Sequence, residues 1–305
     1  MKNFLITGGA GFVGSHLAAE LVSKGNKITI LDDLNTGKIN NLEKIKEKIN
    51  FIKGDIRDLD LLREICKDKD GVFHQAARAS VQESFEKPDE YHDVNVKGTE
   101  NVFTAAKEFG IKVVYASSSS VYGNPIELPI REESAKNPIN PYAQTKLDKE
   151  KLAIKFAKDG VKIIGLRYLN IIGEGQSKEY AGVIKLFLER IQQKLPPRIN
   201  GDGLQARDFV YVGDVVSANI LSMDSDVNHT FFNVGTGTKI SILEIAKIMI
   251  KYSGLNLEPI FGPPLKGDVN ITLADISHIQ NKLNWKPTIF LEEWLKQKIA
   301  SFNIN

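Results

Sequence analysis

The chain has 305 residues, of which 42% are hydrophobic and 26% are charged, and its formal net charge is +2. This composition predicts one large globular domain or two unequal ones, and the near-neutral charge argues against nucleic acid or an anionic membrane as a partner. The single cysteine, Cys66, excludes an intrachain disulfide, and no apolar run approaches the roughly 20 residues that would span a bilayer. We therefore expect a cytoplasmic protein.

The first half of the chain alternates between short apolar runs and amphipathic stretches. The apolar runs predict buried parallel strands at 3–7, 27–32, 49–54, 71–77, 112–118 and 161–168. Helical patterns lie between most of them, as at 14–25 and 95–110, each ending in a glycine. This alternation predicts an α/β fold with a doubly wound parallel sheet, in which ligands bind at the carboxyl ends of the strands.

After about residue 170 the loops become longer and the strands fewer. Ser241 and Glu244 form a possible capping box at the start of a helix over 241–254. We expect residues 1–170 to form a Rossmann-type domain and residues 171–305 to form mainly a smaller substrate-binding lobe. The segment 207–235 is expected to return to the first domain.

A glycine-rich turn follows the first predicted strand directly. Residues 9–14 read G-x-G-x-x-G and open a helical pattern, which is the context of a dinucleotide fingerprint. Asp32 ends the second strand, where an acidic residue accepts a hydrogen bond from the adenosine ribose and repels a 2′-phosphate. The turn therefore predicts a site for a dinucleotide pyrophosphate, with NAD favoured over NADP.

A tyrosine and a lysine lie four residues apart in a later helix. Asn140 and Pro141 suit the N-cap and first position of that helix, which places Tyr142 and Lys146 on one face. A nearby ammonium would stabilise the Tyr142 phenolate and lower its pKa from about 10, as a general base requires. By spacing alone, an incidental surface pair is the more common explanation.

Four serines, residues 117–120, end the strand before this helix. One of them could donate a hydrogen bond to a substrate oxygen at the edge of the sheet. Serines in turns more often satisfy backbone groups, and we expect that of most of the four.

Several motifs occur together and in a fixed order. They are TGGAGFVG, Asp32, GDIRD, HQAA, SSSSVYG, YAQTK, LRYLNIIG and INGDGLQARDFVYVGDV. Together they resemble the extended short-chain dehydrogenases/reductases, within the NAD-dependent nucleotide-sugar epimerase/dehydratase family. The resemblance extends from about residue 3 to residue 290. It favours a catalytic role for the Tyr142–Lys146 pair over an incidental surface pair.

The resemblance implies a role for each matching residue. Tyr142 would be the general base, Lys146 its partner and Ser118 the catalytic serine. NAD would contact Gly8, Gly11, Phe12, Val13, Gly14, Asp32, Asp33, Asn35, Thr36, Gly37, Asp55, Ile56, Ala76, Ala77, Tyr142 and Lys146. Substrate would contact Ser118, Tyr142, Asn170, Arg207, Asp268 and Thr272, and no metal ion is implied.

Two serines narrow the range of reactions that the resemblance to this family implies. Dehydratases of the family carry Asp-Glu after the catalytic hydroxyl, whereas this chain has Ser119 and Ser120. The glutamate usual in related decarboxylases is also missing from this loop. The resemblance therefore implies 4-epimerisation of a nucleotide sugar of the UDP-glucose and UDP-galactose type, through a 4-keto intermediate. A UDP-glucuronate 4-epimerase, a net nucleotide-sugar reductase and a non-catalytic NAD-binding regulator remain alternatives.

Residues in the second half of the chain bear on the substrate, and two earlier segments bear on assembly. Leu265 replaces an arginine that grips the diphosphate in this family, so Lys266 or Lys185 is expected to compensate. Thr272 matches a position beside the sugar C2 substituent, where a small residue leaves room for an N-acetyl group. Homodimers are common in the family, and residues 88–109 and 141–159 are the expected contact helices.

Overall fold

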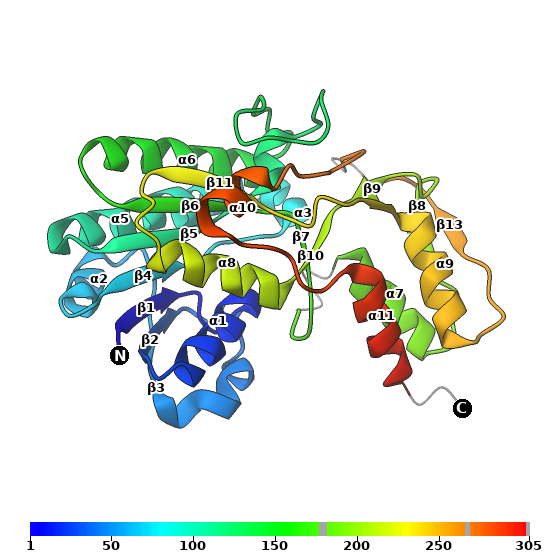
Figure 1. The fold of residues 1–305 in the computed structure, drawn as a ribbon, viewed down its shortest axis with the longest axis horizontal. Coiled ribbons are helices and arrows are strands. Elements are labelled where there is room, and N and C mark those ends of the chain that lie inside the picture. The colour runs from blue at the N-terminus through cyan, green and yellow to red at the C-terminus, as the bar shows by residue number, and fades with distance from the viewer. Residues whose placement is uncertain (177–181, 266–268, 303–305) are drawn as a thin grey trace.

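The computed structural model describes residues 1–176, 182–265 and 269–302. Its centre is a seven-stranded parallel sheet with the order β11-β6-β5-β4-β1-β2-β3 (Figure 1). The strands are β1 (Asn3–Thr7), β2 (Lys27–Asp32), β3 (Ile49–Lys53), β4 (Gly71–His74), β5 (Lys112–Ser118), β6 (Ile163–Tyr168) and β11 (Thr230–Val234). The predicted Rossmann-type fold is confirmed.

Helices cover both faces of this sheet. On one face, α1 (Phe12–Ser23) and α8 (Val212–Asp224) pack over a core that includes Leu17 and Val215. On the other, α2 (Leu59–Cys66), α5 (Gly98–Phe109) and α6 (Pro141–Lys158) enclose a second core. The inner strands β1, β4, β5 and β6 are buried on both sides, which explains their apolar sequences, whereas the edge strand β3 is partly exposed.

The connection from β4 to α5 differs from the prediction. The apolar run 71–77 forms a strand only as far as His74, and three short helical pieces follow. These pieces are α3 (Val81–Glu86), α4 (Pro88–His92) and a π-helical turn, η2 (Asp93–Lys97). Residues 75–79 thereby leave the sheet and line the cavity described below.

The segment after β6 crosses to the smaller lobe and returns. The short strand β7 (Asn170–Ile172) pairs in parallel with β10 (Phe209–Tyr211), and α8 and β11 then rejoin the large sheet. The helix α10 (Ser277–Leu283) packs against β11. We propose residues 1–170 with this return segment as the cofactor-binding unit and most of 171–305 as the other.

The smaller lobe has a core of its own. It contains α7 (Val183–Gln192), α9 (Ile242–Ser253) and α11 (Leu291–Ala300), which bury side chains such as Phe187 and Trp294. Short strand pairs complete it: β8 (Arg198–Asn200) with β13 (Ile260–Gly262), and β9 (Ala206–Arg207) with β12 (Ile240–Ser241). The capping box of Ser241 and Glu244 is present at the start of α9, as predicted. Among the described helices, none combines the length and the apolar character needed to cross a membrane.

Candidate active site

A cavity of about 660 Å³ lies at the carboxyl ends of the central strands. It is the place where a doubly wound sheet is expected to bind its ligand. Its walls bring together most of the predicted site residues: Gly8, Gly11, Phe12, Val13, Gly14, Asp32, Asp33, Thr36, Asp55, Ile56, Ala76, Ala77, Ser118, Tyr142 and Lys146.

The glycine turn leaves no room for side chains. A Cβ on Gly14 would lie 2.2 Å from the carbonyl oxygen of Gly8, and one on Gly8 would lie 2.6 Å from the amide of Ala76. Gly8 also has a φ of 70°, which favours glycine. No side chain caps the N-terminus of α1 at Gly11. The first amides of this helix therefore face the cavity, which suits them to bind a pyrophosphate.

The Asp32 carboxylate is buried at the end of β2 and shapes the loop that follows. Its two oxygens accept hydrogen bonds from the amides of Ala10 and Leu34, at 2.9 and 2.8 Å. Burial raises the pKa of Asp32, and these amide bonds oppose that shift. A Cβ on Gly37 would lie 2.8 Å from an Asp32 oxygen. Each carboxylate oxygen retains a lone pair for a ribose hydroxyl, since an ionised carboxylate accepts about four hydrogen bonds.

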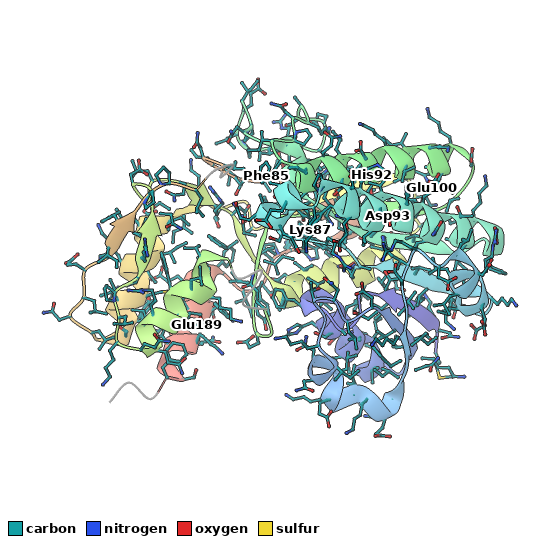
Figure 2. All side chains as sticks on the ribbon, turned by 180° about the vertical axis from the view of Figure 1, so that it is seen from behind. Phe85, Lys87, His92, Asp93, Glu100 and Glu189 are labelled. Carbon is teal, nitrogen blue, oxygen red and sulfur yellow. The ribbon has the colours of Figure 1, made fainter. Side chains whose placement is uncertain are left out.

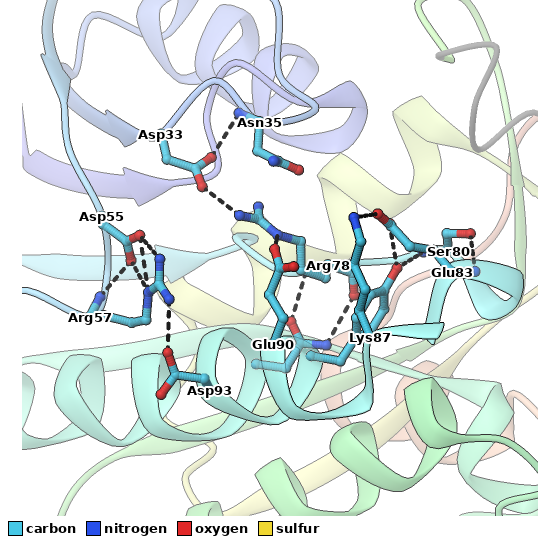
Figure 3. A network of polar contacts seen from close by, with 12 residues as sticks. Asp33, Asn35, Asp55, Arg57, Arg78, Ser80, Glu83, Lys87, Glu90 and Asp93 are labelled. Carbon is cyan, nitrogen blue, oxygen red and sulfur yellow. Dashed lines mark hydrogen bonds and ion pairs between the residues drawn. The ribbon is translucent and has the colours of Figure 1, made fainter. Parts of the chain in front are cut away.

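A network of charged side chains closes this end of the cavity, and sequence reasoning missed its centre, Arg78. The Arg78 guanidinium lines the cavity and contacts Asp33 at 3.1 Å and Glu90 at 3.2 Å (Figure 3). Beside it, Arg57 bridges Asp55 and Asp93, at 2.7 and 2.8 Å. The ion pairs link the strand ends to the helices that follow β4. Arg78 directly follows the HQAA motif, and this position in the sequence could have identified it as a site residue.

Ser118, Tyr142 and Lys146 line the same cavity. Asn140 caps α6 by accepting from the Ala143 amide at 2.8 Å, which places Tyr142 in the first turn of the helix. The Ser118 hydroxyl lies close enough to the Tyr142 hydroxyl to lower the pKa of Tyr142. Lys146 lies one turn further on, donates to the Ala116 carbonyl at 3.1 Å and has its Nζ 5.6 Å from the centre of the Tyr142 ring.

The expected direction of the Tyr142 pKa shift was wrong. Burial raises the pKa of Tyr142 above its usual value, and the nearby Ser118 hydroxyl opposes this only in part. Burial also lowers the pKa of Lys146 to about 8, while Glu150 opposes that shift. Desolvation disfavours the charged form of both groups and outweighs their proximity here.

Two of the other three serines make different contacts. The amide of Ser120 donates to the Ser118 hydroxyl at 3.1 Å, which stabilises the turn. Ser117 donates to the buried carboxylate of Glu150 at 2.6 Å. Ser117, Gln75 and Lys38 also line the cavity, although sequence reasoning did not include them among the site residues. Lys185, which was expected to compensate for Leu265, lines it as well.

Several predicted residues lie away from the cavity wall. Asn35 and Gly37 belong to the loop after β2 and are not among the described lining residues. Asn170 and Thr272 contact each other at 3.3 Å, and Asn170 also donates to the Asp208 carbonyl. Arg207 is buried and donates to the carbonyls of Ala206 and Asn270. Asp268 and Lys266 lie outside the described residues.

Comparison with known proteins agrees with this arrangement. The family model described as "NAD dependent epimerase/dehydratase family" matches residues 4–235. A putative UDP-glucose 4-epimerase of Methanocaldococcus jannaschii is 40% identical, over 97% of this chain and 96% of that relative. The chain therefore belongs to the NAD-dependent epimerase/dehydratase family, and its cofactor is NAD.

Two solved structures are similar over almost their whole length. The UDP-glucose 4-epimerase of Thermotoga maritima, solved with UDP-glucose, has a TM-score of 0.93 and 34% identity, covering 98% of each chain. The UDP-N-acetylglucosamine 4-epimerase of Methanobrevibacter ruminantium, in complex with UDP-N-acetylmuramic acid, also has a TM-score of 0.93. It is 38% identical, over 99% of this chain and 98% of the other. The sugars named for these proteins differ at C2.

Proposed function

We propose that this protein catalyses 4-epimerisation of a nucleotide sugar of the UDP-glucose and UDP-galactose type. The observation that carries the proposal is the convergence of Ser118, Tyr142 and Lys146, the last one helical turn after Tyr142, on the same cavity as the glycine turn and Asp32. These residues combine proton transfer with dinucleotide binding, as oxidation and re-reduction at one carbon requires.

The protein residues handle the proton of the sugar 4-hydroxyl. Tyr142 removes this proton, while Ser118 donates a hydrogen bond to the same oxygen. Lys146, protonated at neutral pH, stabilises the negative charge on the Tyr142 oxygen. The glycine turn and Asp32 would hold NAD, which would supply the hydride chemistry at C4: removal of hydride to form a 4-keto sugar and its return to the opposite face. Tyr142 then returns the proton, so neither electrons nor protons are gained overall.

The substrate diphosphate and sugar would occupy the side of the cavity next to the smaller lobe. Lys185, in the first turn of α7, lines the cavity and could neutralise phosphate charge, whereas Leu265 cannot. Asn170 and Thr272 come from neighbouring segments and contact each other, as expected of residues that share one subsite. Thr272 is small, and we propose that N-acetylated hexoses are accepted beside plain ones.

The reaction is tested with a panel of nucleotide sugars and NMR analysis of the products. UDP-galactose should convert to UDP-glucose without net consumption of NAD. Conversion of UDP-glucuronate alone would favour the uronate 4-epimerase instead. Stoichiometric consumption of a reduced cofactor would indicate a reductase, and lack of turnover on every sugar would favour a regulator that only binds NAD.

We propose a homodimer formed through residues 88–109 and 141–159. This face carries exposed apolar side chains at Phe109 and Ile154, and Figure 2 shows charged and polar residues such as His92 and Glu100 around it. A mass measurement by light scattering should give twice the mass of the chain, and Ile154→Glu should lower it. A monomeric wild-type protein would refute this assembly.

A further inference from the structure

Helix α6 directs three side chains, one per turn, at the end of strand β5. Tyr142 and Ser118 line the same cavity, Lys146 donates to the Ala116 carbonyl at 3.1 Å, and Glu150 accepts from Ser117 at 2.6 Å. Three consecutive strand residues thus face side chains from three successive turns of one helix. The first two of these side chains belong to the proposed reaction, whereas Glu150 has no role in it.

We propose that Glu150 is a positioning residue that keeps the Lys146 ammonium charged and fixes the end of β5 against α6. The inference rests on the proposed role of Lys146 and deepens it. It concerns cofactor binding as well as turnover, so it can be tested without a substrate.

Glu150 is held rigidly where it lies. Arg167, on β6, donates to both of its carboxylate oxygens at 2.8 Å, and both side chains are at most 3% exposed. Arg167 is fixed in turn by the Tyr122 hydroxyl and the Glu132 carbonyl, each at 2.7 Å. Because these partners surround the carboxylate, it cannot rotate away from β5.

The charges around Lys146 leave Glu150 as its favourable partner. On α6 the neighbours are Tyr142, Lys149 and Glu150, while β4 contributes His74 and β6 contributes Arg167. Lys149 and His74 are buried, and burial holds the pKa of each well below its usual value, which disfavours a positive charge on either. Lys149 Nζ has no hydrogen-bond partner among the described residues. Within the described part of the chain, Glu150 is the charged group that counteracts the effect of burial on the Lys146 pKa.

Removal of this carboxylate should therefore make Lys146 lose its proton at lower pH. The test is the dissociation constant of NAD, measured by calorimetry from neutral to alkaline pH. In the wild-type protein we expect NAD binding to weaken as pH rises through about 8, where Lys146 loses its charge. In Glu150→Gln the midpoint should move to lower pH by about one unit, the usual scale for loss of a close opposite charge.

The matched control is Asp148→Asn, on the same helix. Asp148 contacts Lys151 at 2.8 Å on the surface. Its replacement by Asn removes the same charge as Glu150→Gln does, but at a position that does not contact β5. Its midpoint should equal that of the wild-type protein. An equal shift in both variants would mean that only net charge matters, and the proposal would fail.

A second variant keeps the proposal testable if Glu150→Gln does not fold. Glu150→Gln leaves the buried Arg167 without its full partner, which is often strongly destabilising, whereas removal of both charges is better tolerated. Glu150→Gln/Arg167→Met should therefore fold and show a shift in the same direction, since Glu150 and not Arg167 is the group that acts on the Lys146 pKa. An unchanged midpoint in a folded variant, or a wild-type midpoint far from pH 8, would overturn the proposal. Failure of the proposed reaction would instead appear as normal NAD binding without turnover.

Discussion

Ser118 is the last residue of β5 and Tyr142 lies in the first turn of α6, yet both line one cavity, and the Ser118 hydroxyl lowers the pKa of Tyr142. Their proximity is set by the caps of two elements. The Ser118 hydroxyl accepts from the Ser120 amide and ends the strand, while Asn140 and Pro141 start the helix. The reactive pair therefore depends on local backbone geometry as well as on the two side chains.

Replacement of Tyr142 by Phe should leave NAD binding intact and lower turnover roughly 100-fold or more, because a general base is lost. Gln144→Ala, at an exposed position on the same helix, is the control and should behave as the wild-type protein. Steady-state assays and calorimetry measure the two effects. Turnover of the Phe variant at the wild-type rate would remove Tyr142 from the mechanism.

Gly14→Ala should be much more harmful than Gly11→Ala. A Cβ at Gly14 would lie 2.2 Å from the Gly8 oxygen, whereas at Gly11 the nearest distance is 3.2 Å, also to the Gly8 oxygen. Overpacking of this kind typically costs about 1–3 kcal/mol, and here it also displaces the helix N-terminus from the pyrophosphate. Thermal unfolding with and without NAD measures both effects. Equal stability and NAD affinity in the two variants would contradict this account of the turn.

Asp32→Ala should weaken NAD binding and reduce discrimination against NADP, because the carboxylate that faces the 2′-phosphate is lost. The change also removes acceptors for the Ala10 and Leu34 amides, so stability should fall. Asp32→Asn separates these effects, since it loses the charge but keeps one acceptor oxygen. Unchanged discrimination in both variants, measured by competition binding, would locate cofactor selection elsewhere.

Thr272→Tyr should depress kcat/KM for UDP-N-acetylgalactosamine far more than for UDP-galactose. Thr272 is buried and contacts Asn170, so a larger side chain must take space from a neighbouring group. Overfilling a packed site typically costs about 1–3 kcal/mol. Thr272→Ser is the matched control and should retain both activities. Equal losses on both sugars would mean that Thr272 does not border the C2 substituent.

Much of the fold follows from local patterns in the sequence. Continuous apolar runs predict buried parallel strands, and β1, β2 and β5 have the predicted bounds. The end of β4 could not be predicted in this way. Residues 75–77, Gln-Ala-Ala, contain no glycine or proline to mark the end of a strand, and only the cavity shows why the chain turns out of the sheet there.

The site was predictable where a motif fixes the backbone and not where distant segments meet. The glycine turn and the Tyr142–Lys146 spacing are local, so their residues are found together in the cavity. The Arg78–Asp33 and Glu150–Arg167 pairs join residues far apart in the chain, and no spacing indicates them. The Tyr142 pKa was misjudged for a related reason, because burial is a property of the folded protein.

The central claim is that hydride leaves C4 of the sugar and returns to the same carbon. UDP-galactose deuterated at C4 tests it directly when incubated with the enzyme and a substoichiometric amount of NAD. We predict UDP-glucose that retains deuterium at C4, with no net change in the cofactor. Conversion that loses the deuterium to solvent, or a complete lack of conversion, would contradict the account.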